Sequence, residues 1–279
     1  MMKRFTKVTA FTLGLVLAAM PMMALAFTFT TIDPPGSTFT FPFDINPHGD
    51  IVGHYVAGGI NHGFLLQEGN FSNIDFPGAT ASFARGINPQ GDIAGFYIAG
   101  GITHGFLLQE GNFSTIDVPG STATLAFGVN PRGDVAGWYI DGGGVNHGFV
   151  LHQGAFTTID VPGSTLTRVL AINARGDVAG FYIANGVNHG FVLRKGAFTT
   201  IDPPGSTSTF VLGINARGDV VGNYVLGGVG HGFLLRQDEV TTIDPPGSTA
   251  TTATGINSEG DIVGFYTAAG VTHGFLAQR

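Results

Sequence analysis

Six histidines stand at one position of a repeated His-Gly-Phe triplet, and this residue type can ligate metals, transfer protons or pair with carboxylates. They are His62, His104, His147, His189, His231 and His273. Six aspartates recur in a second motif, an Ile-Asp pair followed after one residue by Pro-Gly: Asp33, Asp75, Asp117, Asp160, Asp202 and Asp244. The register of the strands that carry the two motifs decides whether the histidines form a ring of metal ligands or six separate pairs.

That register follows from the turn between the two motifs. A two-residue hairpin at Glu68-Gly69 would place His62 opposite Asp75 on neighbouring antiparallel strands. The same register pairs His104 with Asp117, His147 with Asp160, His189 with Asp202 and His231 with Asp244, and closure of the chain would pair His273 with Asp33. Because an imidazole that donates to a carboxylate is self-satisfied, we interpret these residues as structural His-Asp pairs and expect neither a metal site nor a cofactor.

A further motif, Asn-x-x-Gly-Asp, begins at Asn46, Asn88, Asn130, Asn173, Asn215 and Asn257. Asn and Asp at short spacing are oxygen ligands for calcium, but a calcium loop generally carries more carboxylates at alternating positions. Asn-Pro-x-Gly is instead a preferred sequence of a type I turn followed by a left-handed glycine. The motif therefore predicts six tight turns.

A catalytic site usually needs one unsymmetrical constellation, so departures from the repeats are the places to seek it. Asp44 stands where the other repeats have Gly or Ala, and His54 stands in a mostly aromatic column. If Asn46 pairs with Asp50 across its turn, Asp44 lies diagonal to His54 on the same face. These two residues are weak catalytic candidates, and we favour a compensated polar pair at a seam between repeats. The remaining off-pattern residues fit scattered surface variation: Arg85, His152, Arg168, Glu239 and Glu259.

Aromatic residues also follow the repeats. All six tyrosines occupy one column, at Tyr55, Tyr97, Tyr139, Tyr182, Tyr224 and Tyr266. We expect them at core or interblade positions with each hydroxyl near the rim. Trp138, the single tryptophan, lies in an apolar column and is predicted to be core rather than a sugar platform.

The spacing of these motifs implies the elements that position them. Removing 26 of the 279 residues leaves 253, which is six repeats of 42 plus one residue. The repeats span 27-68, 69-110, 111-153, 154-195, 196-237 and 238-279, and the extra residue is a glycine in Gly142-Gly143-Gly144. No second domain or linker is left over, so 27-279 is expected to form a single domain.

Four short strands are expected in each repeat, for example at 71-75, 81-85, 92-98 and 104-108. Four strands in a repeat of this length predict an all-β, six-bladed β-propeller. An open solenoid is the rival architecture, but solenoids need atypical capping repeats and the last repeat here is ordinary. Because the repeats begin with an outer strand at 27-33, that strand would complete the last blade and close the ring.

Residues 1-26 have the pattern of a signal peptide. Lys3, Arg4 and Lys7 precede an apolar stretch, and Ala24-Leu25-Ala26 forms a small-residue cleavage site. An uncleaved anchor is the alternative, but Pro21 interrupts an apolar run that is short for a membrane span. We expect an exported monomer, secreted or periplasmic, with no membrane insertion after signal removal.

Charge and cysteine content narrow the class of partner. Nine of the 12 cations remain after residue 26 against 19 acids, a net charge of −10, which makes nucleic acid an unsuitable partner. The chain has no cysteine, so neither disulfides nor lipid attached to cysteine contribute to it. Stability is therefore expected to come from packing alone.

The run Gly-Ile-Asn-x-x-Gly-Asp-Ile-Val-Gly-x-Tyr, followed by His-Gly-Phe-Leu, resembles the HAF-type extracellular repeats of exported bacterial proteins. The resemblance covers all six copies after residue 26. It implies export but carries no catalytic residues, because that family has no established activity. The middle residue of the triplet is Gly in every copy here, where the family name implies Ala, and this exchange looks conservative in size.

The sequence is compatible with three functions. The first is an exported non-enzymatic binding or scaffold module for an extracellular glycan or protein, in which loops on one face of the propeller bind a repetitive ligand with avidity. The second is a polysaccharide hydrolase or lyase with a single site, in which Asp44 and His54, or a carboxylate of the central channel, act as acid and base. The third is a purely structural envelope protein, and the fold alone does not decide among the three.

Overall fold

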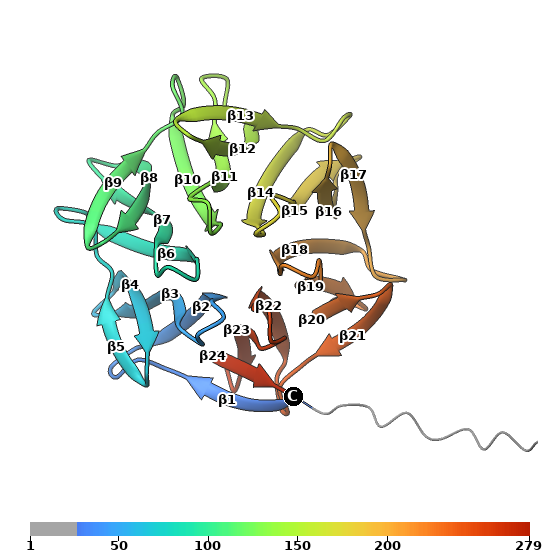
Figure 1. Ribbon diagram of the computed structural model, residues 1–279. Helices are drawn as coiled ribbons and strands as arrows, with labels where there is room; N and C mark the ends of the chain where they lie inside the picture. Colours follow the sequence, from blue (N-terminus) through green and yellow to red (C-terminus); the bar gives the residue numbers. More distant parts are fainter. Residues whose placement is uncertain (1–26) are drawn as a thin grey trace, which may run out of the picture.

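A computed structural model describes residues 27–279, which form 24 β-strands in six four-stranded antiparallel sheets around one axis (Figure 1). The predicted six-bladed β-propeller is therefore confirmed. The predicted signal peptide lies outside the described residues. Across 27–279 there is no helix with the length and apolar character needed to cross a membrane.

The blades are numbered from one to six in chain order, and the innermost strand of each comes first. Blade one contains β2 (Phe39–Ile45), β3 (Ile51–Ala57), β4 (Ile60–Gln67) and β5 (Asn70–Asn73). Blade two contains β6 (Ala81–Ile87), β7 (Ile93–Ala99), β8 (Ile102–Gln109) and β9 (Asn112–Ile116). Blade three contains β10 (Ala123–Val129), β11 (Val135–Ile140), β12 (Asn146–His152) and β13 (Ala155–Ile159).

The second half of the ring repeats this plan. Blade four contains β14 (Leu166–Ile172), β15 (Val178–Ala184), β16 (Val187–Arg194) and β17 (Ala197–Ile201). Blade five contains β18 (Ser208–Ile214), β19 (Val220–Leu226), β20 (Val229–Arg236) and β21 (Glu239–Ile243). Blade six contains β22 (Ala250–Ile256), β23 (Ile262–Ala268), β24 (Val271–Gln278) and, as its outer strand, β1 (Thr28–Ile32).

The outer strand of blade six comes from the other end of the described chain. β1 pairs antiparallel with β24, and Thr28 lies opposite Gln278 while Ile32 lies opposite Gly274. Figure 1 shows the first and last strands side by side at the closing blade. The ring is thus closed by ladder hydrogen bonds, as the phase of the repeats predicts.

Antiparallel connections give the ring two distinct ends. The Asn-x-x-Gly-Asp turns and the hairpins equivalent to Glu68-Gly69 lie at one end, which we name the turn end. The hairpins equivalent to Gly58-Gly59 and the Asp-x-Pro-Gly connections lie at the other, which we name the loop end. The His-Asp pairs belong to the loop end, because each aspartate directly precedes such a connection.

The hydrophobic core lies between neighbouring blades. Phenylalanine of the His-Gly-Phe triplet is fully buried in every blade, at Phe64, Phe106, Phe149, Phe191, Phe233 and Phe275. One core cluster, for example, joins Val52 of blade one to Ile93 and Phe106 of blade two. Burial of these rings supplies much of the energy that holds the blades together.

The glycine of the triplet permits this packing. A Cβ added at Gly63 would lie 2.4 Å from the carbonyl oxygen of Ile74, and one at Gly105 would lie 2.8 Å from the carbonyl oxygen of Ile116. These contacts are shorter than a methyl group tolerates, and backbone atoms cannot rotate away. The exchange of Ala for Gly, which the sequence suggests is conservative, is therefore not conservative in this chain.

Candidate functional site

All six histidines of the triplet lie against the aspartates that the register assigns to them. The Nδ1 to carboxylate distances are 2.9 Å for His62–Asp75, 2.8 Å for His104–Asp117, 2.9 Å for His147–Asp160, 2.7 Å for His189–Asp202, 2.7 Å for His231–Asp244 and 2.8 Å for His273–Asp33. Each aspartate lies just beyond its outer strand, where the hairpin register continues past the last paired residues. The histidine ring is thereby fixed in one orientation in every blade.

A tyrosine ring packs against each of these histidines, with ring centroids 5.3 to 5.5 Å apart. In blade two the ring centroids of Tyr97 and His104 are 5.3 Å apart, and the Tyr97 hydroxyl lies 3.0 Å from the Thr115 hydroxyl. When such an imidazole is neutral and its Nδ1–H donates to the carboxylate, Nε2 carries a lone pair that can accept a hydrogen bond. With the exception of His147, no histidine of this set has a partner for Nε2 within residues 27–279. The loop end therefore carries a repeated hydrogen-bond acceptor, the histidine Nε2, beside a tyrosine ring.

Blade three departs from this arrangement. The loop that contains the extra glycine places Asp141 3.5 Å from Nε2 of His147, so this ring lies between two carboxylates. Burial alone would lower the pKa of His147, but the hydrogen bonds and charges of Asp160 and Asp141 outweigh it and raise the pKa. The acceptor presented by the other blades is therefore covered in blade three.

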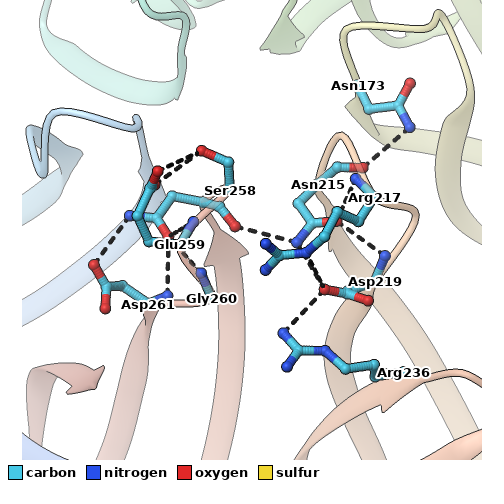
Figure 2. Close-up of polar contacts among 10 residues, drawn as sticks. Asn173, Asn215, Arg217, Asp219, Arg236, Ser258, Glu259, Gly260 and Asp261 are labelled. Atoms are coloured by element: carbon cyan, nitrogen blue, oxygen red, sulfur yellow. Dashed lines mark hydrogen bonds and ion pairs between the residues drawn. The ribbon is translucent and has the colours of Figure 1, made fainter. Parts of the chain in front are cut away.

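The six asparagines of the turn motif form a ring at the turn end. Each side-chain oxygen accepts backbone N–H groups of its own turn, as in Asn215, which accepts from Arg217 and Asp219. Each side-chain nitrogen donates to the aspartate of the motif, and that of Asn215 also donates to the Asn257 carbonyl of the next blade (Figure 2). The motif thus forms the predicted turns and additionally ties neighbouring blades together. In the part of the chain that the structure describes, no cluster of three or more His, Cys, Asp or Glu side chains is placed to hold a metal ion.

The structure does not bring Asp44 and His54 together as an acid–base pair. Asp44 lies opposite Val52 as expected, but a β-bulge between Pro42 and Asp44 shifts the register before His54, which lies opposite Phe41. The His54 ring stacks on Phe41, with centroids 4.7 Å apart, and its buried Nδ1 has no hydrogen-bonding partner among the described residues. Burial, assisted by the charge of Arg85, lowers the pKa of His54 well below its ordinary value, so the ring is neutral.

Asp44 lines a cavity enclosed by the six innermost strands. Its carboxylate accepts hydrogen bonds from the amides of Ile45 (2.9 Å) and Ile87 (3.1 Å). Burial raises the pKa of Asp44 to about 7, against the lowering effect of these two amides. The cavity has a volume of about 40 Å³, enough for roughly three water molecules, and is lined by residues of all six innermost strands.

Arg85 also lines this axial cavity, so the expectation of surface variation is wrong for this residue. Its guanidinium carbon lies 3.6 Å from the centroid of the Phe43 ring, and burial lowers the pKa of Arg85 to about 9. Arg168 is likewise packed over an aromatic ring, 4.0 Å from the centroid of Trp138. Trp138 is 8% exposed and belongs to the core, as its column predicts.

Arginines at the turn end escaped the sequence interpretation. Arg132, Arg175 and Arg217 follow their asparagines by two residues in three consecutive repeats, and Arg194 and Arg236 end the third strands of blades four and five. The signal in the sequence is that this column holds arginine only in these three neighbouring repeats. Only the three-dimensional arrangement shows that side chains from two columns meet.

Comparison with known proteins identifies the fold but no family. No protein-family model matches the chain, and no curated protein matches it by sequence. Among solved structures, a mutant of AofleA from Arthrobotrys oligospora is similar over 91% of this chain and 86% of that protein, with 13% identity and a TM-score of 0.58.

Two further solved structures have comparable similarity. A mutant of the Aleuria aurantia lectin in complex with a fucosylated N-acetylglucosamine matches 87% of this chain and 96% of that protein, with 13% identity and a TM-score of 0.54. A catalytically inactive virginiamycin B lyase from Staphylococcus aureus, with quinupristin, matches 91% of this chain and 100% of that protein, with 13% identity and a TM-score of 0.53. At these identities the similarity establishes a shared β-propeller architecture and nothing finer.

Proposed function

We propose that this protein is an exported, non-enzymatic binding module whose loop end binds a repetitive extracellular glycan. The observation that carries the proposal is the recurrence of one surface arrangement in successive blades. Each combines a Tyr-His-Asp set with an exposed aliphatic residue at or just before the start of the third strand: Ile60, Ile102, Val145, Val187, Val229 and Val271. Equivalent weak sites on a rigid ring favour a ligand that repeats, because binding at one site raises the effective concentration at the next.

The chemistry of one such site suits a neutral sugar. In blade two, Ile102 is 51% exposed and precedes His104 by two residues on the same strand, so both side chains lie on one face. The aliphatic group can pack against the C–H face of a sugar ring, while Nε2 of His104 can accept a hydroxyl proton. Such a contact is shallow, so affinity would depend on several blades acting together.

Catalysis is supported less well than binding. The catalytic hypothesis requires an acid–base pair at Asp44 and His54, but across residues 27–279 no hydrogen bond or ion pair joins them. The solved structures that share this fold include both a lectin and a lyase, so the architecture is compatible with either function. Export is supported by the pattern of residues 1–26 and by the resemblance to HAF-type repeats.

A glycan array followed by isothermal titration calorimetry tests the proposal. We expect a neutral oligosaccharide to bind at about five equivalent sites per chain, because Asp141 covers the acceptor of blade three. The double variant Ile102→Ser, Val187→Ser should remove two sites, while the matched variant Val145→Ser in blade three should remove none. Absence of any glycan ligand, or a single site per chain, would contradict the proposal.

A further inference from the structure

The turn end has a strongly uneven distribution of charge. Seven of the nine cationic side chains that follow residue 26 lie there: Arg132, Arg175, Arg194, Lys195, Arg217, Arg236 and Arg279. All of the first six belong to blades three, four and five. In the turn column, the flanking blades six and two instead have Glu259 and Gln90, so the cationic region ends at both sides.

Two buried aspartates hold four of these arginines in position. One oxygen of Asp177 lies 3.4 Å from Nε of Arg175 and 3.2 Å from Nε of Arg194. One oxygen of Asp219 lies 3.3 Å from Nε of Arg217 and 3.0 Å from a terminal nitrogen of Arg236 (Figure 2). Each carboxylate therefore neutralises one guanidinium of a pair and leaves one positive charge in excess.

The excess charge faces solvent because the two acids do not. Asp177 and Asp219 are each 6% exposed. The side chains of Arg175 and Arg217 are about half exposed. The hydrogen bonds of Asn215, Arg236 and Arg217 outweigh the effect of burial and lower the pKa of Asp219, so this carboxylate stays ionised beneath the arginines.

Each pair of guanidinium groups converges over a turn glycine of the next blade. A Cβ at Gly218 would lie 2.6 Å from a terminal nitrogen of Arg194 and 3.1 Å from one of Arg175. A Cβ at Gly260 would lie 3.1 Å and 3.5 Å from the corresponding atoms of Arg236 and Arg217. A donor from a turn and a donor from the end of a strand thus approach one point, and they can do so because neither glycine carries a side chain.

A groove connects the two pairs at the seam between blades four and five. Its main part has a volume of about 660 Å³ and is lined on blade four by Arg194, Lys195 and Ala197. Blade five contributes Arg217 and Leu235 among its lining residues, and Arg175 lines the adjoining part. The buried Nε of Arg236 has no hydrogen-bonding partner within residues 27–279, so a donor at this wall is unsatisfied.

We propose that this groove binds an acidic glycan, through carboxylate or sulfate groups on neighbouring sugars held by the guanidinium pairs. Guanidinium forks match the geometry of such oxyanions and bind them more strongly than neutral donors do. Apolar walls at Ala197 and Leu235 suit the C–H faces of the sugar rings. Five cationic and three acidic side chains line the groove. Because residues 27–279 carry a net charge of −10, this small positive area fits a short acidic segment better than a long nucleic acid.

Calorimetric titration with a tetrasaccharide of uronic acid and with a neutral tetrasaccharide of the same length tests this site. We expect the uronate to bind and its affinity to fall as salt rises, whereas the neutral sugar does not bind at the groove. The double variant Arg194→Gln, Arg236→Gln should weaken uronate binding by about tenfold or more. Arg132→Gln, which lies in the same turn column as Arg175 and Arg217 but outside the groove, should leave the affinity unchanged.

A second variant keeps the test sound if the double variant folds poorly. Lys195 is exposed and makes no hydrogen bond or ion pair with any residue from 27 to 279, so Lys195→Gln should fold normally and lower the affinity about threefold. No binding of the uronate, tighter binding of an oligonucleotide of equal charge, or binding of the neutral tetrasaccharide that Arg194→Gln, Arg236→Gln weakens as strongly as it weakens uronate binding would overturn the proposal. So would inorganic sulfate that binds as tightly as the uronate. The loop-end variant Ile102→Ser should not affect this binding, so the two proposals can fail separately.

Discussion

Nδ1 of His273 lies 2.8 Å from the carboxylate of Asp33, although 240 positions separate the two residues in the chain. The same contact recurs within single hairpins in the other five blades. At the closing blade it joins β1 to β24, whose paired residues include Ile32, which is 4% exposed. The contact between Asp33 and His273 is therefore part of the closure of the ring.

Deletion of residues 27–33 should open the ring. The change removes the outer strand of blade six, the burial of Ile32 and the packing of Phe29 on Phe275, whose ring centroids are 5.7 Å apart. We expect the free energy of unfolding to fall by about 4 kcal/mol or more, as measured by chemical denaturation. A peptide of residues 27–33 added in trans should restore part of the loss. An unchanged denaturation midpoint would show that β1 does not hold the ring closed.

Gly105→Ala should destabilise the protein although it adds one methyl group. The new Cβ would lie 2.8 Å from the Ile116 carbonyl oxygen, so the blade must shift, at a cost of about 1–3 kcal/mol. Thermal and chemical unfolding measure the change. Gly142→Ala is the matched control, since no atom lies within 4 Å of its Cβ, and it should alter stability by less than about 0.5 kcal/mol.

The two carboxylates around His147 predict a pH effect in blade three. Because the folded pKa of His147 is raised above its unfolded value of about 6.5, its contribution to stability is complete below that pH and is lost as pH rises through the folded pKa. Nuclear magnetic resonance titration of the imidazole nitrogens should give a pKa above 6.5. Asp141→Asn should lower this pKa, while its side-chain oxygen still accepts the amides of Gly143 and Val145. An unchanged titration in that variant would exclude the role of Asp141.

Asp44 predicts a second decrease of stability with rising pH, over a lower pH range than that of His147. Its folded pKa of about 7 exceeds the ordinary value of 3.8, so the folded state retains a proton that the unfolded chain releases. Stability should therefore decrease as pH rises from about 4 to 7. Asp44→Gly, which restores the residue type of most other blades, should flatten this decrease in denaturation curves. A carbon-detected titration that places the Asp44 pKa near 4 would contradict the prediction.

The sequence predicted the parts of the fold that depend on regular repetition. The period of the motifs gave six blades, and the two-residue hairpin at Glu68-Gly69 was sufficient to pair His62 with Asp75. The relation of Asp44 to His54 could not be obtained in this way, because the bulge between Pro42 and Asp44 breaks the regular alternation of a strand.

Features formed between blades were also inaccessible from the sequence. Arg85 lines the axial cavity, where burial lowers its pKa. The six innermost strands that form this cavity come together only when the ring closes. The approach of Arg175 and Arg194 to Gly218 likewise crosses a seam. Side chains that meet across a seam leave no periodic signal within one repeat.

Closure by β1 also means that the chain of the ring could begin in another blade. The guanidinium of Arg279 lies 4.8 Å from the centroid of the Phe27 ring, so the two ends of the described chain are adjacent. A short linker between them, with new ends at an exposed hairpin such as Gly100-Gly101, would give a circular permutant with the same six blades. In that permutant every blade except the one that was cut would be built from continuous chain. Permutants cut in different blades would show how the stability of the ring depends on the blade in which the chain is broken.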